Sequence, residues 1–275
     1  MAAASICWSI GGLCFKFIPW NAMSIIGLRA LFAAVVFAIF RRGLKVKLTK
    51  GNILAALSLS GTTVLFVFAN QLTTAAAAVM LQFTAPIFVL MINFFIYRKK
   101  PKLSEILAVL VTTLGMLLFF ADRLESGQML GNILALISGV TFACVFVFNR
   151  RPDTDPEHSV MLGFIINTLL WTPFAFFDQS ITMDIVPWAF IILMGTVQVG
   201  LAYVFFTLSI KRTPALLGIL IVALEPVLNP IWVALFHTER PGMYSILGGV
   251  VIVITVVSYN IWVSKRGTPD GIADG

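Results

Sequence analysis

The sequence predicts an all-α membrane protein with ten transmembrane helices in two inverted five-helix repeats and with both termini cytoplasmic. Apolar residues make up 59% of the 275 residues, and charged residues only 11%. A soluble domain of this size needs a charged exterior that this composition does not supply. Apolar runs of about 20 residues, each long enough to cross a hydrocarbon core of roughly 30 Å, recur along the chain. A transmembrane barrel is excluded, because its strands would alternate polar and apolar residues in segments of about ten.

Ten such runs define the predicted spans, taken in order. The spans are 2–18, 21–40, 52–70, 75–97, 103–120, 129–149, 159–177, 185–210, 214–236 and 243–263. The first repeat is residues 1–121, the second is residues 129–263, and residues 264–275 form a polar C-terminal tail. Because Met1 leads directly into three alanines, we expect the natural first helix to begin upstream of this residue.

Two pairs of prolines recur at a fixed offset. Pro86 and Pro101 in the first half correspond to Pro226 and Pro241 in the second, since 226 − 86 and 241 − 101 both equal 140. The chain therefore contains two copies of one unit. Each copy holds five spans, an odd number, so the second copy enters the membrane in the opposite orientation. In proteins built from inverted repeats, prolines at matching places inside apolar spans indicate a binding site near the midplane between the copies.

The basic residues lie on one side of the predicted spans. The formal net charge is +7 and the pI about 9.6, values that would also suit a nucleic-acid-binding protein. The positions of the Lys and Arg residues exclude nucleic acid as a partner, because an excess of these residues marks the cytoplasmic loops of a membrane protein. The partner is the lipid bilayer instead. The inner loops hold Arg41, Arg42, Lys45, Lys47, Lys50, Arg98, Lys99, Lys100, Lys102, Arg150, Arg151, Lys211, Arg212, Lys265 and Arg266. We expect the longest of these loops, 150–159, to be a solvated turn.

The sequence contains no pattern for a cofactor, a metal or a nucleotide. The three cysteines lie inside spans, and the two histidines stand apart from one another, so neither a zinc spacing nor a disulfide framework is present. No GxxxxGK[ST] motif occurs, which excludes ATP-driven transport within this chain. An intramembrane enzyme would need convergent acids, a nucleophile with its base, or metal ligands. Glu225 is the one glutamate in the middle of a span, since Glu105 lies at the very start of its span, and no histidine lies within a span. We therefore predict that the protein is not an enzyme.

Glu225 is the most informative polar residue within the spans. It lies about halfway along the ninth span and directly precedes Pro226, whose missing N–H leaves a backbone carbonyl free. A carboxylate in so dry a setting is suited to carrying a proton. Two other interpretations remain open: an ion pair with Arg29, which lies midway along the second span, or a hydrogen bond to a neighbouring helix backbone.

Other polar and aromatic residues form stripes at helical spacing. Gln82 precedes Pro86 by one turn on the fourth span, and Asn229 follows Glu225 by one turn on the ninth. Such stripes suit an amphipathic small molecule, with rings for stacking and amides for orientation, although aromatic residues also face lipid. The predicted cavity residues are Trp8, Gln82, Asn167, Trp171, Gln198, Glu225 and Asn229, with Pro86 and Pro226 bending their helices.

Three features of the chain occur together in one known group of proteins. They are the segments LQFTAPIFVLMINFF (81–95) and IVALEPVLNPIWVALF (221–236), the mid-span Arg29, and the ten spans in two repeats. In these features the chain resembles the EamA-type members of the drug/metabolite transporter superfamily. It implies a secondary transporter of the bacterial inner membrane that exports a small metabolite by alternating access. Amino acids, including aromatic ones, are the expected cargo, and a lipid-linked substrate or passive movement through a channel or facilitator are the alternatives.

One departure from the family pattern limits what the resemblance implies. Members often carry a Gly-Glu pair at the ends of the fourth and ninth spans. Glu239 matches the second instance without its glycine, and Arg98-Lys99-Lys100 replaces the first. An acid-dependent role at the end of the fourth span is therefore not expected.

The two fused copies already supply a complete cavity, which allows a monomer to work.

Overall fold

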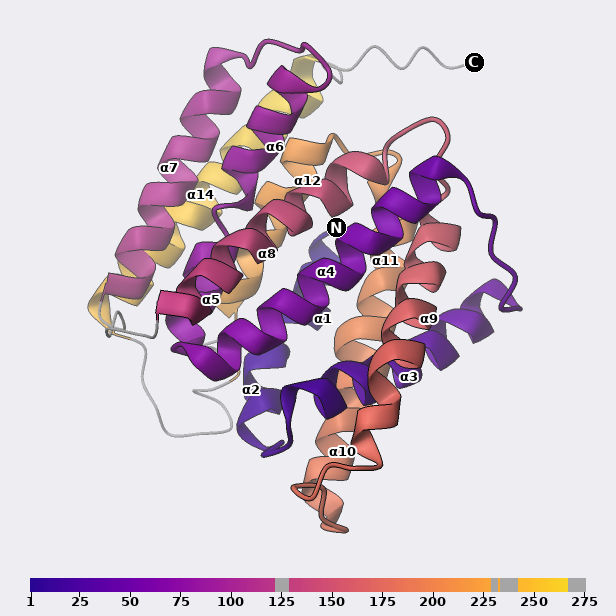
Figure 1. The fold of residues 1–275 in the computed structure, drawn as a ribbon. Helices are drawn as coiled ribbons and strands as arrows, with labels where there is room; N and C mark the ends of the chain where they lie inside the picture. The colour runs from indigo at the N-terminus through magenta and orange to yellow at the C-terminus, as the bar shows by residue number, and fades with distance from the viewer. Residues whose placement is uncertain (122–128, 229–231, 233–241, 267–275) are drawn as a thin grey trace.

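The protein is an all-α membrane protein. A computed structural model describes residues 1–121, 129–228, 232 and 242–266, and the regular structure within these ranges is entirely helical (Figure 1). Eight helices among the described residues are long and apolar enough to cross a membrane. Two further apolar helices, Ala2–Phe15 and Ala215–Leu228, are shorter than a full span and coincide with the first and ninth predicted spans.

The helices follow the predicted spans closely. In the first half they are α1 (Ala2–Ser9), α2 (Gly11–Lys16), α3 (Ala22–Arg41), α4 (Lys50–Leu72), α5 (Ala75–Gln82), α6 (Ala85–Phe95) and α7 (Leu103–Phe120). In the second half they are α8 (Met129–Phe148), α9 (Pro156–Ala175), α10 (Ile185–Leu193), the π-helix η2 (Met194–Leu201), α11 (Ala202–Ile210), α12 (Ala215–Val222) and α14 (Met243–Arg266).

Four predicted spans are not uniform α-helices. The first is divided after Ser9, the fourth after Gln82 and the ninth after Val222, and the eighth contains η2. The length of an apolar run predicts where a span lies. It does not predict whether the backbone hydrogen bonds of the helix continue without a break, because kinks follow from prolines, glycine pairs and π-segments. The remainder of the ninth predicted span, apart from Trp232, lies outside the described residues beyond Leu228.

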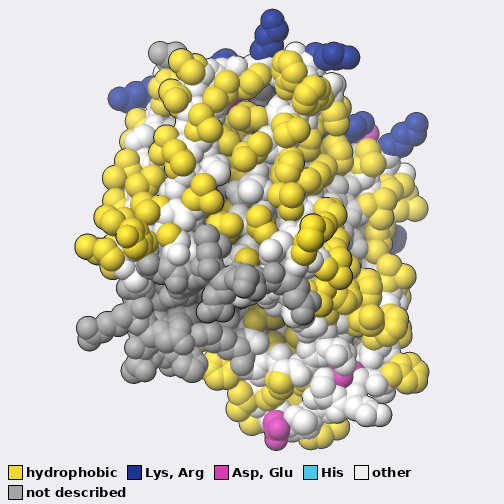
Figure 2. Space-filling model, turned by 60° about the vertical axis from the view of Figure 1, so that its left-hand side comes forward, with side chains coloured by type: hydrophobic (Ala, Val, Ile, Leu, Met, Phe, Trp, Pro, Cys, Tyr) yellow, Lys and Arg dark blue, Asp and Glu magenta, His cyan; other side chains and the backbone are white. Residues whose placement is uncertain are grey.

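The helices pack around an aromatic interior. The closest helix pairs are α3 with α9, α4 with α8 and α7 with α14, and the last pair forms one flank of the molecule (Figure 1). Phe37, Phe146, Phe164 and Phe206 are fully buried in the main cluster. Apolar side chains cover the flank, and Lys and Arg project from one end (Figure 2). This distribution is that of a protein with a lipid-facing belt and one basic face.

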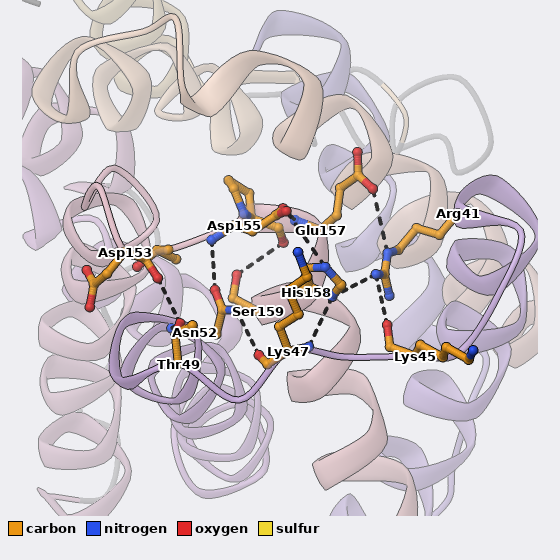
Figure 3. A network of polar contacts seen from close by, with 12 residues as sticks. Arg41, Lys45, Lys47, Thr49, Asn52, Asp153, Asp155, Glu157, His158 and Ser159 are labelled. Carbon is orange, nitrogen blue, oxygen red and sulfur yellow. Dashed lines mark hydrogen bonds and ion pairs between the residues drawn. The ribbon is translucent and has the colours of Figure 1, made fainter.

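The α3–α4 loop is fastened to the start of α9 at the basic face (Figure 3). The amide of Asn52 bridges the two segments: its Oδ1 accepts from Asp155 N at 2.7 Å, and its Nδ2 donates to Lys47 O at 2.8 Å. His158 Nδ1 accepts from Lys47 N at 3.2 Å and lies 2.8 Å from Arg41 Nη2. Loop 150–159, which we expected to be a solvated turn, is solvated only in part. Pro152, Asp153 and Asp155 are exposed, whereas Thr154 is buried and Thr49 Oγ1 donates to Asp153 O at 2.7 Å.

His158→Phe is expected to destabilise the basic face, because it leaves Lys47 N without the Nδ1 acceptor and leaves Arg41 Nη2 with Lys45 O alone. The expected loss is about 1–3 kcal/mol of unfolding free energy, measured by thermal or denaturant unfolding in detergent. His158→Asn is the matched control, since its side-chain oxygen can occupy the place of Nδ1 and should retain most of the stability. Equal losses in both variants would contradict the role given to Nδ1.

Asp178 caps the N-terminus of α3 at the opposite end of the molecule. Its carboxylate accepts from Asn21 N at 3.1 Å, Asn21 Nδ2 at 2.7 Å and Ser24 Oγ at 2.5 Å. Ser180 N and Oγ donate to it as well, at 2.9 and 2.5 Å. Burial alone would raise the pKa of this carboxyl, but the hydrogen bonds from Ser180, Ser24 and Asn21 together lower the pKa to about 2.

Asp178→Asn is therefore expected to remove a pH-dependent part of the stability. The folded-state pKa lies below the ordinary value of 3.8, so the stabilisation is complete above about pH 4 and is lost as the pH falls towards 2. We expect a contribution of about 1–2 kcal/mol at neutral pH, after allowance for solvent screening. Unfolding measured from pH 7 to pH 2 should show the two proteins converging in that window. A constant difference across it would contradict the assignment.

Candidate functional site

The fourth and ninth predicted spans break at matching positions. Helix α5 ends at a cap on Phe83, and α12 ends at a cap on Ala223, and 223 − 83 equals 140. The offset is the one that relates Pro86 to Pro226 in the sequence. A proline cannot donate to the carbonyl four residues before it, and its ring disturbs the preceding turn. The break therefore precedes each proline by three residues, for the same reason in both halves.

Each break frees the backbone carbonyl four residues before the proline, and each carbonyl meets the first helix of the other half. The Val222 carbonyl lies 3.5 Å from Ser5 Oγ of α1. The Gln82 carbonyl faces α8, where a Cβ on Gly139 would lie only 2.9 Å from it. The Gln82 side chain is buried and makes no hydrogen bond with any residue that the structure describes. Gly139 thus lets α8 approach the exposed Gln82 carbonyl, and Ser5 lets α1 approach the exposed Val222 carbonyl.

Trp8 anchors an aromatic cluster beside these breaks. Its ring packs against Tyr203 at 5.1 Å, Phe206 at 6.1 Å and Phe142 at 6.5 Å between centroids. Tyr203 in turn meets Phe164 edge to face at 5.5 Å. Edge-to-face contacts of this kind hold aromatic side chains in fixed orientations. The cluster therefore brings α1, α8, α9 and α11 to one point.

Gln198 lies in the π-helix η2 and points at the first span. Its Nε2 donates to Trp8 O at 3.3 Å, whereas its buried Oε1 has no hydrogen-bond partner among the described residues. Gly11 makes the approach possible, since a Cβ there would lie 2.9 Å from Nε2. Single π-segments inside α-helices are frequent at functional sites, and an unpartnered buried acceptor requires an explanation. A hydrogen-bond donor on a bound ligand would pair with Gln198 Oε1 and explain its burial.

Arg29 and Glu225 lie in the same interior region. Their charges interact electrostatically with each other and with the Tyr203 hydroxyl. Arg29 is buried, with its guanidinium carbon 6.0 Å from the centre of the Phe15 ring. Within the part of the chain that the structure describes, the two side chains form no direct ion pair and Glu225 makes no hydrogen bond. The interaction between Arg29 and Glu225 is therefore a charge interaction at longer range, and the three interpretations given for Glu225 stay predictions.

The remaining predicted cavity residues are not joined to this cluster by the described contacts. Asn167 is fully buried and accepts from Ser60 Oγ at 2.5 Å, so its amide links α9 to α4. Trp171 packs edge to face on Phe68 at 6.0 Å, within the second apolar cluster. Asn229 lies outside the described residues. Helical stripes show which residues share one face of a helix, but not which face meets the interior.

Tyr203 joins Trp8 to the Arg29 and Glu225 pair, although it is not among the residues predicted from the sequence. It contacts Trp8 directly and interacts electrostatically with both Arg29 and Glu225. Its position near the middle of a long apolar run was the available signal, because a hydroxyl there needs a polar partner. The described residues contain no group of His, Cys, Asp and Glu side chains that could hold a metal ion.

The chain matches the sequence model of a known family over almost its whole length. The model of the EamA-like transporter family matches residues 1–121 and 129–261. The chain belongs to the EamA-like transporter family. Membership in that family points to transport of a small molecule across a membrane and not to catalysis. This confirms the resemblance noted in the sequence and the prediction that the protein is not an enzyme.

Individual relatives of this EamA-like protein are distant. An uncharacterized transporter, YxxF, of Bacillus subtilis is 21% identical over 208 residues, covering 74% of this chain and about two thirds (66%) of the relative. A biotin transporter of Escherichia coli K12 is 21% identical over 257 residues, covering 87% of this chain and 84% of the relative. A solved structure described only as a crystal structure of protein superposes with a TM-score of 0.79 at 18% identity, covering 94% and 95% of the two chains. That likeness shows the fold alone.

Gly139→Ala is expected to disturb the break between α5 and α6. The added Cβ would lie 2.9 Å from Gln82 O and 3.2 Å from Leu81 O, and backbone atoms cannot rotate away. We expect a loss of about 1–3 kcal/mol in stability and a matching loss of transport. Gly61→Ala on α4 is the control, because its Cβ would meet only Thr141 Cγ2 at an ordinary 3.5 Å. Thermal unfolding and transport by both variants test this, and an unaffected Gly139→Ala would contradict it.

Proposed function

We propose that the protein is a secondary transporter of the bacterial inner membrane that exports amino acids, including aromatic ones, by alternating access between two inverted five-helix repeats. The observation that carries the proposal is the group formed by Arg29, Glu225 and Tyr203 beside two helices that break at equivalent positions. Membership in the EamA-like family supports the class of transporter. The charged and aromatic side chains of the interior support amino acids as the cargo.

The interior charges suit a zwitterion. A guanidinium binds a carboxylate through parallel N–H donors, and a carboxylate binds an ammonium group. Arg29 and Glu225 supply one group of each kind without neutralising one another in a direct ion pair. The Trp8 and Tyr203 rings would contact an apolar or aromatic side chain of the same molecule. A relative named biotin transporter is consistent with small metabolites as cargo.

The inverted repeat is supported by exchange of partners between the halves. The broken helices of the first half, α5 and α6, pack on α8, the first helix of the second half. The broken helix α12 of the second half packs on α1, the first helix of the first half. Such an exchange follows from a pseudo-two-fold axis in the membrane plane, which places the breaks at the centre where the two halves can rock. The positive-inside rule would place both termini in the cytoplasm.

Glu225→Gln is expected to abolish gradient-driven accumulation while leaving the protein folded. Purified protein in proteoliposomes would be given labelled amino acids, aromatic ones included, with and without an imposed pH gradient. If Glu225 carries the coupled proton, the amide cannot take its place, and only equilibration of substrate remains. Glu157→Gln is the matched control, because Glu157 lies at the basic face and is half exposed.

Three results would alter the proposal in different ways. Accumulation that persists in Glu225→Gln would show that this carboxylate does not carry the coupling proton. Equilibration alone in both wild type and variant would identify a facilitator. If no amino acid moves while another metabolite does, the cargo is wrong and the class of transporter stands.

A further inference from the structure

A pocket of about 950 Å³ opens at the basic face, away from the central residues. It lies where α6, α7, α8, α12 and α14 meet, and its lining belongs to the ends of these helices. Lys99 and Lys100 follow the end of α6, Lys211 follows α11, and Val263 lies in the last turn of α14. The pocket is therefore at the level where the spans leave the hydrocarbon and meet the lipid headgroups.

The rim of the pocket is strongly cationic. Among the described residues, six basic side chains line it with one carboxylate, Glu105, which accepts from Lys102 N at 2.8 Å at the start of α7. One of the six, Arg151, forms an ion pair with Asp153 next to the lining, with its Nε 2.8 Å from Oδ1. The six are Lys99, Lys100, Lys102, Arg150, Arg151 and Lys211. A concentration of like charge in a concave site raises the local concentration of anions, and a helix-rich wall of low dielectric strengthens that field.

The backbone fixes the positions of these charges. Arg98 has a left-handed conformation with φ of 56°, and Lys99 N donates back to Asn93 O at 3.0 Å, so the chain turns sharply at the end of α6. Lys211 Nζ donates to Arg151 O at 2.9 Å and to Thr154 O at 2.5 Å, which ties the α8–α9 loop to the end of α11. The rim is thus built by structured turns.

The floor of the pocket is apolar. Leu216 and Val263 are buried, and Leu90 and the buried Tyr259 complete the same surface from α6 and α14. A soluble phosphate ion needs no such floor, whereas a molecule with an anionic head and an apolar body matches both parts. Basic pockets between transmembrane helices on the cytoplasmic side are suited to anionic lipid headgroups.

We propose that this pocket binds the headgroup of an anionic phospholipid, with the phosphate among Lys100, Lys102 and their neighbours and the glycerol and upper acyl carbons against the apolar floor. The site lies apart from the Arg29, Glu225 and Tyr203 group, so the proposal does not depend on the cargo. Lipid bound there would join α6, α7 and α14 to α12 and so link the flanking helix pair to a helix that carries a central break.

The test compares lipid binding by wild type with binding by Lys100→Gln/Lys102→Gln. Native mass spectrometry of the full chain in detergent would be titrated with dioleoyl phosphatidylglycerol and, separately, dioleoyl phosphatidylcholine. We expect wild type to prefer phosphatidylglycerol and the double variant to lose about 30-fold in affinity for it, because each lysine near an anionic surface contributes roughly a factor of five. The Lys45→Gln/Lys47→Gln protein is the control, since it loses the same charge on the same face outside the pocket lining.

A soluble competitor distinguishes the two sources of phosphate. Glycerol 3-phosphate carries the charged group without acyl chains, and we expect it to displace little phosphatidylglycerol at millimolar concentration. Displacement as effective as that by added lipid would overturn the lipid assignment in favour of a soluble anion. Equal loss of affinity in the pocket and control variants would also overturn it, by showing that only the net charge of the face matters. Transport assays are not needed for either result.

Discussion

The interior of this protein depends on one constraint: two prolines interrupt the backbone hydrogen bonds of their helices. In a membrane an unpaired carbonyl costs several kcal/mol unless protein or a polar cavity satisfies it. The breaks before Pro86 and Pro226 must therefore be buried against other helices, and they are, on α8 and α1. This requirement draws the first helix of each half to the broken helix of the other.

The same requirement explains why small and polar residues gather where the halves meet. Gly139 and Gly11 permit close approach to an exposed carbonyl and to the Gln198 amide, respectively. Arg29 and Glu225 lie in the interior and not in the lipid-facing belt, because only a polar interior shared by several helices lowers the cost of their charges. The polar side chains of the interior and the paired backbone breaks thus occupy one region of the EamA-like fold.

The two ends of the molecule are stabilised differently. At the basic face, hydrogen bonds join the α3–α4 loop to the start of α9 (Figure 3). The pocket rim adds further basic side chains at the same face. At the opposite end a single carboxylate, Asp178, caps α3 and fixes the turn after α9. The basic layer at one end and the Asp178 cap at the other match the one-sided distribution of Lys and Arg that is typical of membrane proteins.

The sequence by itself determined the all-α membrane class, the positions of the apolar spans and the two breaks that precede Pro86 and Pro226, because apolar run length and proline position are local properties of the chain. The break after Ser9 and the π-helix in the eighth span had no such signal in the sequence. The sequence also singled out Arg29, Glu225, Trp8 and Gln198, since polar groups within apolar runs are costly. The tertiary structure decided how they meet: through Tyr203, whose role depends on the rotation of α11 against α1 and α3. It likewise separated Asn167 from this group and assembled the basic pocket from five helix ends. Such groupings depend on packing between distant segments, which periodicity along one helix does not encode.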